Sequence, residues 1–479
     1  MTGPTAAPST APTTAPPALP TLTRRDDTDL PARLARSAAA TRGAVPGVDD
    51  VHAWLAERRE ATRFAVDRIP FADLDGWSFD AGSGNLGHRS GRFFTVEGLR
   101  VGVGDPQTAA WGQPIIKQPE IGILGILAKE IDGVLHFLMQ AKMEPGNPNL
   151  LQLSPTVQAT RSNYTQVHRG SAVRYLEYFT RPERGRMLSD VLQSEHGSWF
   201  YRKRNRNMIV EVGGDVPPHE DFRWLTLGQL AELLRHDNLV NMDARSVLAS
   251  LPGDGTSRAL ESDTDLLSWI AAMRSWNIVR TGLVPLATVP GWERGGTSID
   301  HHTGRYFRVV AVSVEAGNRE VSAWTQPLFE PCGEGVVAFL TRDIEGVPHV
   351  LVNARLEPGF LDTVELGPTV QFTPHNYAHL PAAEHPPFAD LVRSPDPSRV
   401  LYSALHSEEG GRFLNAVSRY MMIEVDEGQV PLDPPPGYRW VSHAQLAELA
   451  RHGHYVNVHA RTLLTCFTVL SARGRLTRA

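Results

Sequence analysis

Residues 110–146 read AWGQPIIKQPEIGILGILAKEIDGVLHFLMQAKMEPG, and residues 323–359 read AWTQPLFEPCGEGVVAFLTRDIEGVPHVLVNARLEPG. The two stretches align without a gap at an offset of 213 residues. Both contain Trp-x-Gln-Pro near the start, a glycine in a short turn, and Glu-Pro-Gly at the end. Self-similarity at one fixed offset is the mark of a repeat, so the chain is a tandem duplication.

The same offset holds outside these stretches. It aligns Pro155–Gln158 with Pro368–Gln371, and after three inserted residues an offset of 216 aligns Ala244-Arg245 with Ala460-Arg461. A period this long is too large for a solenoid and fits two globular domains of one design. We expect a disordered Pro/Thr/Ala-rich tail over 1–40, a first repeat over 62–252, a linker with a short helix over 253–276, and a second repeat over 277–473.

Each repeat reads as an α+β domain. Asp132-Gly133 lies between the apolar runs Ile121–Lys129 and Val134–Met143, which predicts a hairpin with a type I′ turn. Further strands are predicted at Arg92–Val103, Met208–Val212 and Met421–Val425. Helices are predicted at Met187–Ser194, at Thr226–Arg235 with Thr226 as N-cap, at Met242–Ala249 and, in the linker, at Leu266–Ser275.

One predicted strand carries a polar face. Alternation from Val134 to Met143 places His136, Gln140, Lys142 and then Glu144 on one side, and the apolar Phe137, Met139, Ala141 and Met143 on the other. A solvent-facing strand would explain one such pattern. The second repeat has His349, Asn353, Arg355 and Glu357 at the matching positions, which favours the wall of a pocket.

A second segment, Trp199–Asn207, combines four cations with aromatic and amide side chains. Guanidinium groups bind phosphate with two hydrogen bonds, and aromatic rings stack on bases. The alternative is a solvated basic strand edge. The second repeat keeps only one of these cations, as Arg419, so phosphate binding is expected at the first repeat.

Composition excludes several classes of protein. The 479 residues include only two cysteines, Cys332 and Cys466, which rules out a disulfide scaffold, and the net charge of −6 disfavours a nucleic-acid binder. We expect no export signal and no membrane span, because the longest apolar run, 121–128, is too short, and we place the protein in the cytoplasm. No Walker, GxGxxG, HExxH or GxSxG motif occurs, so a bound nucleotide triphosphate, a nicotinamide cofactor, a catalytic metal and a serine hydrolase are unsupported.

The sequence resembles the NDP-hexose 2,3-dehydratases of deoxysugar biosynthesis over almost its whole length after the tail. The resemblance rests on GNLGHRSGRFF (84–94), QPIIKQPEIGILGIL (113–127), LHFLMQAKMEPGN (135–147), LQLSPTVQATRSNYT (151–165), QSEHGSWFYRKRNRNM (193–208) and VNMDAR (240–245).

The resemblance implies tandem Nudix-like α/β/α sandwich domains and a homodimer. The catalytic Nudix box is absent from both repeats, so a metal-dependent pyrophosphohydrolase is disfavoured. The implied substrate is a dTDP-linked 4-keto-6-deoxyhexose, which loses its C2 hydroxyl to give a 3,4-diketo-2,6-dideoxy sugar for antibiotic biosynthesis. This chemistry needs no redox cofactor and no metal; a base, an oxyanion donor and a proton donor suffice.

For that reaction we cast Glu144 as the base that removes the C3 proton, Lys142 as the cation facing the enolate, and Tyr164 as the donor to the leaving hydroxyl. Glu144 as a sugar ligand is an alternative, and His88, His136 and His168 are rival acids or bases. Arg202, Arg204 and Arg206 are candidates for the diphosphate, and Trp111, Trp199 and Tyr201 for stacking on thymine. Other candidate substrate ligands are Trp77, Asn85, Gln140, Gln158, Arg161 and Asn163.

The first repeat is expected to hold the active site, and the second to be a relic, a structural partner or a binding-only site. Two other functions remain: a non-catalytic nucleotide-sugar-binding helper protein, and a Nudix-like hydrolase with unorthodox residues. Loss of the keto-sugar nucleotide on incubation distinguishes the dehydratase from the helper.

Overall fold

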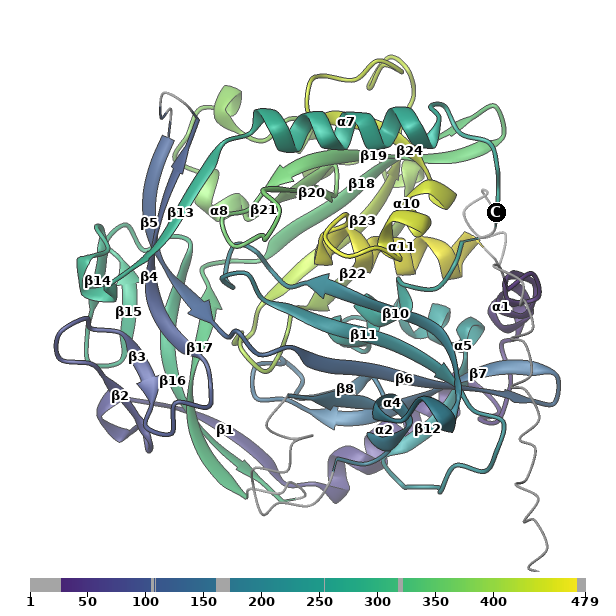
Figure 1. Ribbon diagram of the computed structural model, residues 1–479, viewed down its shortest axis with the longest axis horizontal. Helices are drawn as coiled ribbons and strands as arrows, with labels where there is room; N and C mark the ends of the chain where they lie inside the picture. The colour runs from purple at the N-terminus through teal and green to yellow at the C-terminus, as the bar shows by residue number, and fades with distance from the viewer. Residues whose placement is uncertain are drawn as a thin grey trace, which may run out of the picture.

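The computed structural model describes residues 27–104, 107, 109–160, 173–253, 255–317 and 322–471. It contains two five-stranded and two seven-stranded sheets, with helices packed between and around them. Figure 1 shows the two small sheets together on one side of the molecule and the two large sheets on the other. The duplication and the mixed α+β class are confirmed. Among the described residues, no helix has the length and apolar character needed to cross a membrane.

The two large sheets have the same strand order. In each, a long hairpin pairs in parallel with a strand from later in the repeat. The strands of the first are β6 (Gly122–Ile131), β7 (Val134–Met143), β8 (Leu151–Ser154), β9 (Val157–Ala159), β10 (Arg186–Ser194), β11 (Arg204–Glu211) and β12 (Phe222–Thr226). Those of the second are β18 (Gly335–Ile344), β19 (Val347–Leu356), β20 (Val364–Gly367), β21 (Val370–Phe372), β22 (Val400–Ser407), β23 (Val417–Glu424) and β24 (Tyr438–Ser442).

The predicted hairpin forms as expected. β6 pairs antiparallel with β7, and the two turn residues Asp132 and Gly133 both have positive φ, 50° and 76°. Positive φ at both central positions defines the type I′ turn, which glycine adopts without steric cost. Glu345 and Gly346 repeat this turn with φ of 52° and 79°.

The two small sheets exchange strands between the repeats. β1 (Phe64–Ile69), from the first repeat, pairs with β16 of the second, and β13 (Val279–Val284) pairs with β4 of the first. The other strands are β2 (Trp77–Phe79), β3 (Leu86–His88), β4 (Thr95–Val103), β5 (Ala109–Lys117), β14 (Trp292–Arg294), β15 (Ser298–His301), β16 (Phe307–Ala316) and β17 (Ala323–Pro331).

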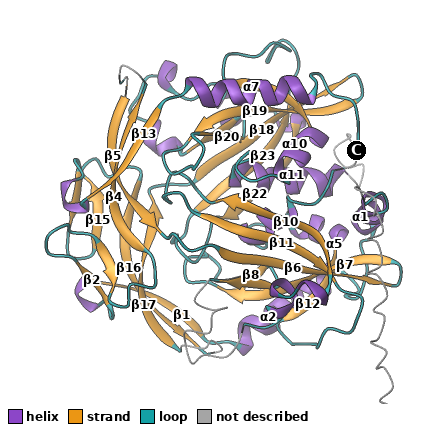
Figure 2. Ribbon diagram, in the orientation of Figure 1, coloured by secondary structure: helices purple, strands orange, loops and turns teal. Residues whose placement is uncertain are grey.

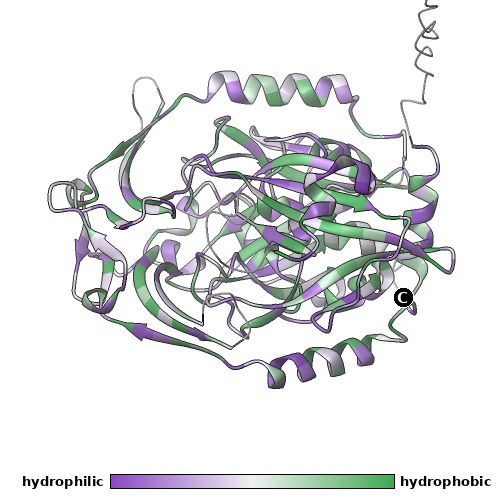
Figure 3. Cartoon of the chain, turned by 60° about the horizontal axis from the view of Figure 1, so that its bottom comes forward, coloured by the Kyte–Doolittle hydropathy of each residue, from purple (hydrophilic) through white to green (hydrophobic). Residues whose placement is uncertain are grey.

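Helices from both repeats fill the space between the large sheets (Figure 2). α6 packs on the first sheet, α11 on the second, and the two helices pack against each other. Their apolar residues form one core with the inner faces of both sheets, where Figure 3 also shows apolar segments gathered. The helices include α5 (Leu227–Leu233), α6 (Met242–Leu248), α10 (His443–Ala450) and α11 (Val458–Ser471).

Helices α5 and α6 confirm the predictions for those segments. α5 begins after Thr226, whose hydroxyl accepts from the Gln229 backbone N–H while the Gln229 side chain accepts from the Thr226 N–H. α6 begins after Asn241, whose side chain accepts from the Ala244 N–H. Ser442 and Gln445 repeat the first arrangement at α10.

Two predicted segments differ in the structure. Met187–Ser194, predicted as a helix, lies in strand β10, because it pairs with β11 along its length. Residues 30–39, placed in the disordered tail, form helix α1 (Leu30–Ala39). Leu30, Leu34 and Ala38 of α1 are buried, and the Ser37 hydroxyl donates to the Leu135 carbonyl at 2.6 Å.

The linker helix is also longer than expected. α7 (Asp263–Trp276) takes the place in the second repeat that α2 (Val48–Ala61) takes in the first. In both, an arginine lies over a helix tryptophan: Arg223 over Trp54 at 5.1 Å and Arg439 over Trp269 at 5.7 Å. The repeats therefore begin at these helices, earlier than residues 62 and 277. Two short helices, α8 (Pro374–Tyr377) and α9 (Ala389–Arg393), flank the second large sheet, and α4 (Glu177–Thr180) the first.

Candidate functional site

Three of the predicted site residues meet at the end of β7. The Lys142 ammonium lies 3.1 Å from a Glu144 carboxylate oxygen and donates to the side-chain oxygen of Gln158. The Gln158 amide nitrogen lies 3.5 Å from the same Glu144 oxygen. Strand alternation accounts for Lys142 and Glu144, and β9 brings Gln158 alongside through its pairing with β6. Glu144 is buried, whereas Lys142 and Gln158 keep partial exposure.

Asp243, in the first turn of α6, completes this group. The Gln158 amide donates to its carboxylate. Burial, followed by the charges of Glu195 and Glu144, raises the pKa of Asp243 to about 7. A carboxyl group that titrates near neutrality, beside a carboxylate paired with a lysine, is the arrangement that acid–base chemistry requires.

A turn from the second repeat covers the Glu144 bend. The Gly146 N–H donates to the Gly410 carbonyl at 2.8 Å, and the Asn415 N–H donates to the Gly146 carbonyl at 2.8 Å. A Cβ on Gly410 would clash with Asn147 Oδ1 and lie 3.0 Å from the Glu144 Cβ, so the two bends are packed closely enough that a larger residue would displace Asn147. The turn carries Glu409 and Arg412, and the Arg412 guanidinium donates to Gln118 at 3.2 Å.

Glu409 has a strongly perturbed carboxyl group. Burial raises its pKa to about 8; Arg412 opposes this change, and Asp243, Glu195 and Glu144 reinforce it. We call Lys142, Glu144, Gln158, Glu195, Asp243 and Glu409 the first polar cluster.

A mirrored group lies in the other half of the molecule, where the turn after β10 covers the Glu357 bend. The Gly359 N–H donates to the Gly197 carbonyl at 2.7 Å, and the Arg202 N–H donates to the Gly359 carbonyl at 2.8 Å. Arg355 pairs with Glu357 at 2.8 Å, as Lys142 pairs with Glu144. We call Arg355, Glu357, Gln371, Glu408, His459 and His196 the second polar cluster.

The two clusters differ in charge at two matched positions. His459 replaces Asp243, and His196 replaces Glu409, so four carboxyl groups in the first cluster become two carboxyl groups and two histidines in the second. Burial opposes ionisation of Glu408, but His459 and His196 outweigh it and lower its pKa. Burial lowers the pKa of His459 to about 4. The two clusters therefore offer different proton chemistry.

His196, Glu408 and His459 are close enough to bind a metal ion, with their ligand atoms within 4.8 Å of one another. Glu408 already accepts a hydrogen bond from the Tyr420 hydroxyl at 3.0 Å and contacts His196 Nε2 at 3.0 Å. Within the described residues, Nδ1 of both histidines is buried without a hydrogen-bond partner. Ligating histidines normally donate through their second nitrogen, so this group fits a hydrogen-bonded network better than a metal centre.

The side chains of the basic segment, residues 199–207, point in two directions just before and along β11. Arg206 forms two hydrogen bonds with Asp190, and Arg202 lies exposed over the Tyr201 ring at 5.1 Å. Lys203 is buried and donates to the Glu120 carbonyl, and Asn205 donates to Glu195 at 2.7 Å. Lys203 and Asn205 therefore face the first polar cluster, whereas alternation along β11 places Arg204 and Arg206 on the opposite face.

Most of the other predicted ligands lie apart from the first polar cluster. His136 is buried at the far end of β7, accepts from the Ala44 N–H at 3.1 Å and contacts the Val134 carbonyl at 2.9 Å, so both ring nitrogens have partners. Trp199 lies in the turn after β10, and its ring is 5.7 Å from the His196 ring of the second polar cluster. Gln140 lies on β7 two residues before Lys142. Trp77, His88 and Trp111 lie on β2, β3 and β5 of one small sheet, and Asn85 directly precedes β3, where its side chain accepts from the Leu286 N–H.

Arg161, Asn163, Tyr164 and the rival His168 lie outside the described residues. Asp243, Glu195, Glu409 and Arg412 were not singled out from the sequence, and Lys203 was counted only among the four cations of the basic segment. Asp243 stands within the quoted string VNMDAR, and Glu195 and Lys203 within QSEHGSWFYRKRNRNM. Glu409 and Arg412 belong to the other repeat, and only a crossing of the repeats brings them here.

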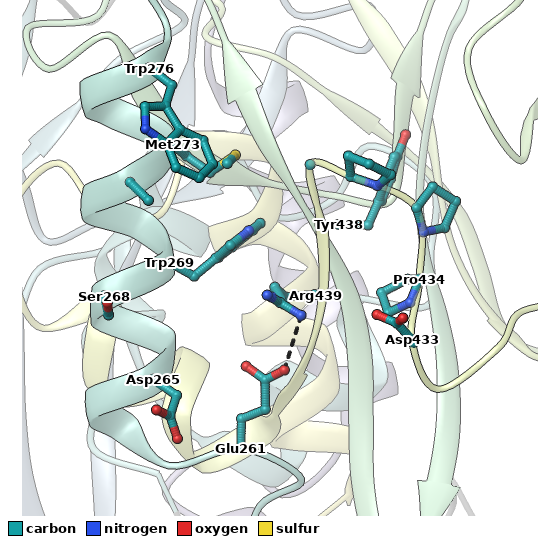
Figure 4. Close-up of a pocket in the computed structure, with 14 residues that line it drawn as sticks. Glu261, Asp265, Ser268, Trp269, Met273, Trp276, Asp433, Pro434, Tyr438 and Arg439 are labelled. Carbon is teal, nitrogen blue, oxygen red and sulfur yellow. Dashed lines mark ion pairs between the residues drawn. The ribbon is translucent and has the colours of Figure 1, made fainter.

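A surface pocket of about 740 Å³ lies between α7 and the loop 433–437. Figure 4 shows Trp269, Met273 and Trp276 extending from the helix, with the Arg439–Glu261 ion pair, 3.2 Å long, at one end. None of the predicted site residues lines it. The pocket is therefore distinct from the first polar cluster.

The chain is similar to known proteins over most of its length. The profile of the family described as NDP-hexose 2,3-dehydratase matches residues 48–251 and 263–467. A curated relative from Amycolatopsis orientalis is 60% identical over 95% of this chain and 98% of its own length. Relatives from Streptomyces violaceoruber and Saccharopolyspora spinosa are 51% and 50% identical over 88% and 91% of this chain, and 97% and 94% of their own lengths.

All three relatives are named dTDP-4-dehydro-6-deoxy-alpha-D-glucopyranose 2,3-dehydratase. The matched ranges begin at α2 and α7, the helices that open the two repeats. Since the profile covers both repeats and each relative shares half or more of its aligned residues, the chain belongs to the NDP-hexose 2,3-dehydratase family.

Proposed function

We propose that the protein removes the C2 hydroxyl of dTDP-4-keto-6-deoxyglucose or a closely similar sugar nucleotide, giving a 3,4-diketo-2,6-dideoxy sugar nucleotide. The observation that carries this proposal is the buried Glu144 carboxylate held by Lys142 at 3.1 Å, beside a carboxyl group that titrates near neutrality. The full-length likeness to enzymes named for this reaction supports it. We further propose a cytoplasmic role in deoxysugar formation for antibiotic biosynthesis.

The C4 ketone acidifies the C3 proton, and the C2 hydroxyl lies β to that ketone. In our proposal Glu144 takes the C3 proton, and Lys142, two residues earlier on the same face of β7, stabilises the enolate at O4. Gln158 orients both groups through its amide. Tyr164 is the proton donor that the sequence suggests for the leaving hydroxyl.

The base assignment is tested with Glu144→Gln, which keeps the size of the side chain and removes its basicity. We expect loss of C3 deuterium exchange in D₂O and a fall in turnover of about 10²-fold or more. Glu357→Gln, at the matched position of the second polar cluster, serves as the control and is expected to turn over normally. Exchange at the wild-type rate in Glu144→Gln would remove Glu144 as the base, and an intact protein that leaves the substrate unchanged would favour the nucleotide-sugar-binding helper.

For the diphosphate we propose Arg202, Arg204 and Arg206, with Trp111, Trp199 and Tyr201 as stacking partners for thymine. Arg202 is the most exposed of these cations, whereas Arg206 would have to leave Asp190 to bind phosphate. Titration of Arg204→Ala with dTDP measures the contribution of that arginine. Unchanged affinity would contradict its assignment.

We also propose that the repeats have the Nudix-like α/β/α sandwich topology and that two chains form a homodimer. The mixed sheets flanked by helices support the first part. α7 supports the second, because Leu267 and Trp276 are 42% and 73% exposed on one helix. Light scattering on the pure protein and on Trp276→Arg tests the dimer: dimeric wild-type protein and a shift toward monomer in the variant are expected.

A further inference from the structure

We propose that the second repeat completes the active site of the first, and that Glu409 is the catalytic acid that protonates the leaving C2 hydroxyl. This inference rests on the proposed dehydration and assigns the proton transfer to the leaving hydroxyl to Glu409, from the other half of the chain, in place of Tyr164. It makes Glu144 and Glu409 a base and acid pair drawn from two repeats.

The backbone places Glu409 at the Glu144 bend. Gly410, the next residue, bonds to Gly146 through its carbonyl, and its Cα lies so close to Glu144 that any added Cβ would contact the Glu144 Cβ at 3.0 Å. On the far side of the turn, the Phe329 N–H donates to the Arg412 carbonyl at 2.9 Å. The turn is therefore held at both ends, and Glu409 is fixed at the edge of the first polar cluster.

The surroundings of Glu409 show that this edge is built for a polar ligand. Glu195 is 5% exposed, and within the described residues its Oε2 atom is buried without a hydrogen-bond partner. A buried carboxylate oxygen without a donor is costly, and a sugar hydroxyl would satisfy it. Cations stand on the same side: Lys142 and Arg412 keep partial exposure, and Lys203 is buried. Arg412 is further fixed over the Phe94 ring at 4.5 Å.

The environment of Glu409 suits a proton donor. Burial and the neighbouring carboxyl groups of Asp243, Glu195 and Glu144 raise its pKa, although Arg412 opposes this change. Glu144 differs in its neighbours, because its carboxyl group lies 3.1 Å from the Lys142 ammonium. A carboxyl group that keeps its proton near neutral pH can act as the acid of the pair.

The proton transfers balance. Glu144 takes the proton from C3, and the electron pair moves through the enolate to form the C2–C3 double bond as the C2–O bond breaks. Glu409 gives its proton to the departing oxygen, which leaves as water. In the tautomerisation that follows, Glu144 returns its proton to C2 and Glu409 takes the proton from the C3 hydroxyl, so both groups regain their starting states and no other reactant is consumed.

The test is Glu409→Gln in the full-length protein, with dTDP-4-keto-6-deoxyglucose as substrate in D₂O. Two quantities are measured: deuterium at C3 of recovered substrate, and the diketone product trapped with an aromatic 1,2-diamine. We expect C3 exchange to persist while product formation falls by about 10²-fold or more, because only the second step needs the acid. Glu409→Asp, which keeps a proton to donate, should recover part of the product.

His196→Gln is the matched control, since His196 occupies the same place in the mirrored turn, and it should form product normally. Product formation by Glu409→Gln at the wild-type rate, or an equal loss of exchange and product in a variant that melts like wild type, would overturn the assignment. The assignment would also be overturned if Tyr164→Phe kept C3 exchange but lost product formation while Glu409→Gln formed product normally. If wild-type protein leaves the substrate unchanged, the proposed function fails instead.

Discussion

Burial of Asp243 in the first polar cluster lowers the stability of the folded protein when this carboxyl group is ionised. Asp243 is buried beside Lys142 at the end of β7, Glu144 just after β7, Glu195 after β10, and Glu409 in the turn after β22. Folding therefore favours the protonated form of Asp243, whose pKa rises from 3.8 to about 7. Its contribution to stability is complete below about pH 4 and is lost as the pH rises through 7, because the folded protein then has to bury a further negative charge close to Glu195 and Glu144.

We therefore expect Asp243→Asn to stabilise the protein above neutral pH. The amide can still accept from Gln158 and carries no charge, so the melting temperature should rise by a few degrees at pH 8, at about 1 °C per kcal/mol for a cooperative unit of this length, and by much less at pH 5. Asp390→Asn, an exposed aspartate on α9, is the control and should give no gain that depends on pH. Equal gains at both pH values for Asp243→Asn would contradict the charge argument. Differential scanning fluorimetry at the two pH values is sufficient.

For single residues, the sequence was informative where the residues lie along one strand. Lys142 and Glu144 were predicted together because alternation alone places them on one face, and the structure joins them to Gln158. Glu409 was beyond the reach of periodicity, since its approach to Glu144 depends on tertiary hydrogen bonds between Gly146 and Gly410. His136 was predicted as a ligand from the same alternation. In the structure its imidazole accepts a hydrogen bond from the Ala44 N–H, and His349 accepts one from the Leu260 N–H in the same way.

Among the elements, the hairpin and capped helices were predictable from local chemistry, and β10 was not. Its apolar residues Met187, Leu188, Val191 and Leu192 recur with helical spacing, and a shift of register between Met187 and Ser189 interrupts the two-residue period of a strand. β22 has the same irregularity between Val400 and Tyr402. Pairing with the neighbouring strand therefore overrides the local pattern in both repeats.

The two capping boxes allow a matched comparison between repeats. Ser442→Ala removes the hydroxyl that accepts from Gln445 and should lower the free energy of unfolding by about 1 kcal/mol. Thr226→Ala should cost more, because the Thr226 hydroxyl also donates to the Ala40 carbonyl at 2.5 Å and so holds the end of α1. Thermal denaturation of both variants checks the order. A smaller loss for Thr226→Ala would show that α1 contributes little through this contact.

In the whole molecule, the repeats are interlocked as well as joined in sequence. β1 and β13 are exchanged between the small sheets. The turn after β10 packs on the Glu357 bend of the second repeat, and the turn after β22 packs on the Glu144 bend of the first. The fully buried Arg245 donates to the Ser407 carbonyl at 2.7 Å, and its counterpart Arg461 donates to the Ser194 carbonyl at 2.6 Å. Duplication was evident from the sequence, but this exchange was not, since an internal alignment is the same for separate and for interlocked domains.

This interlocking predicts that neither half folds alone. A fragment ending near residue 253 would lack β13 at the edge of its small sheet and would expose the shared core between α6 and α11. It should be insoluble or lack a cooperative melting transition, whereas co-expression with a fragment starting near residue 256 should yield a soluble complex. Cleavage of the full chain at a protease site inserted at Gly255 should leave the halves associated, and activity retained, because every interlocking contact persists. A first-half fragment that melts cooperatively and forms the diketone by itself would show that the second repeat is dispensable, and with it the acid supplied by Glu409.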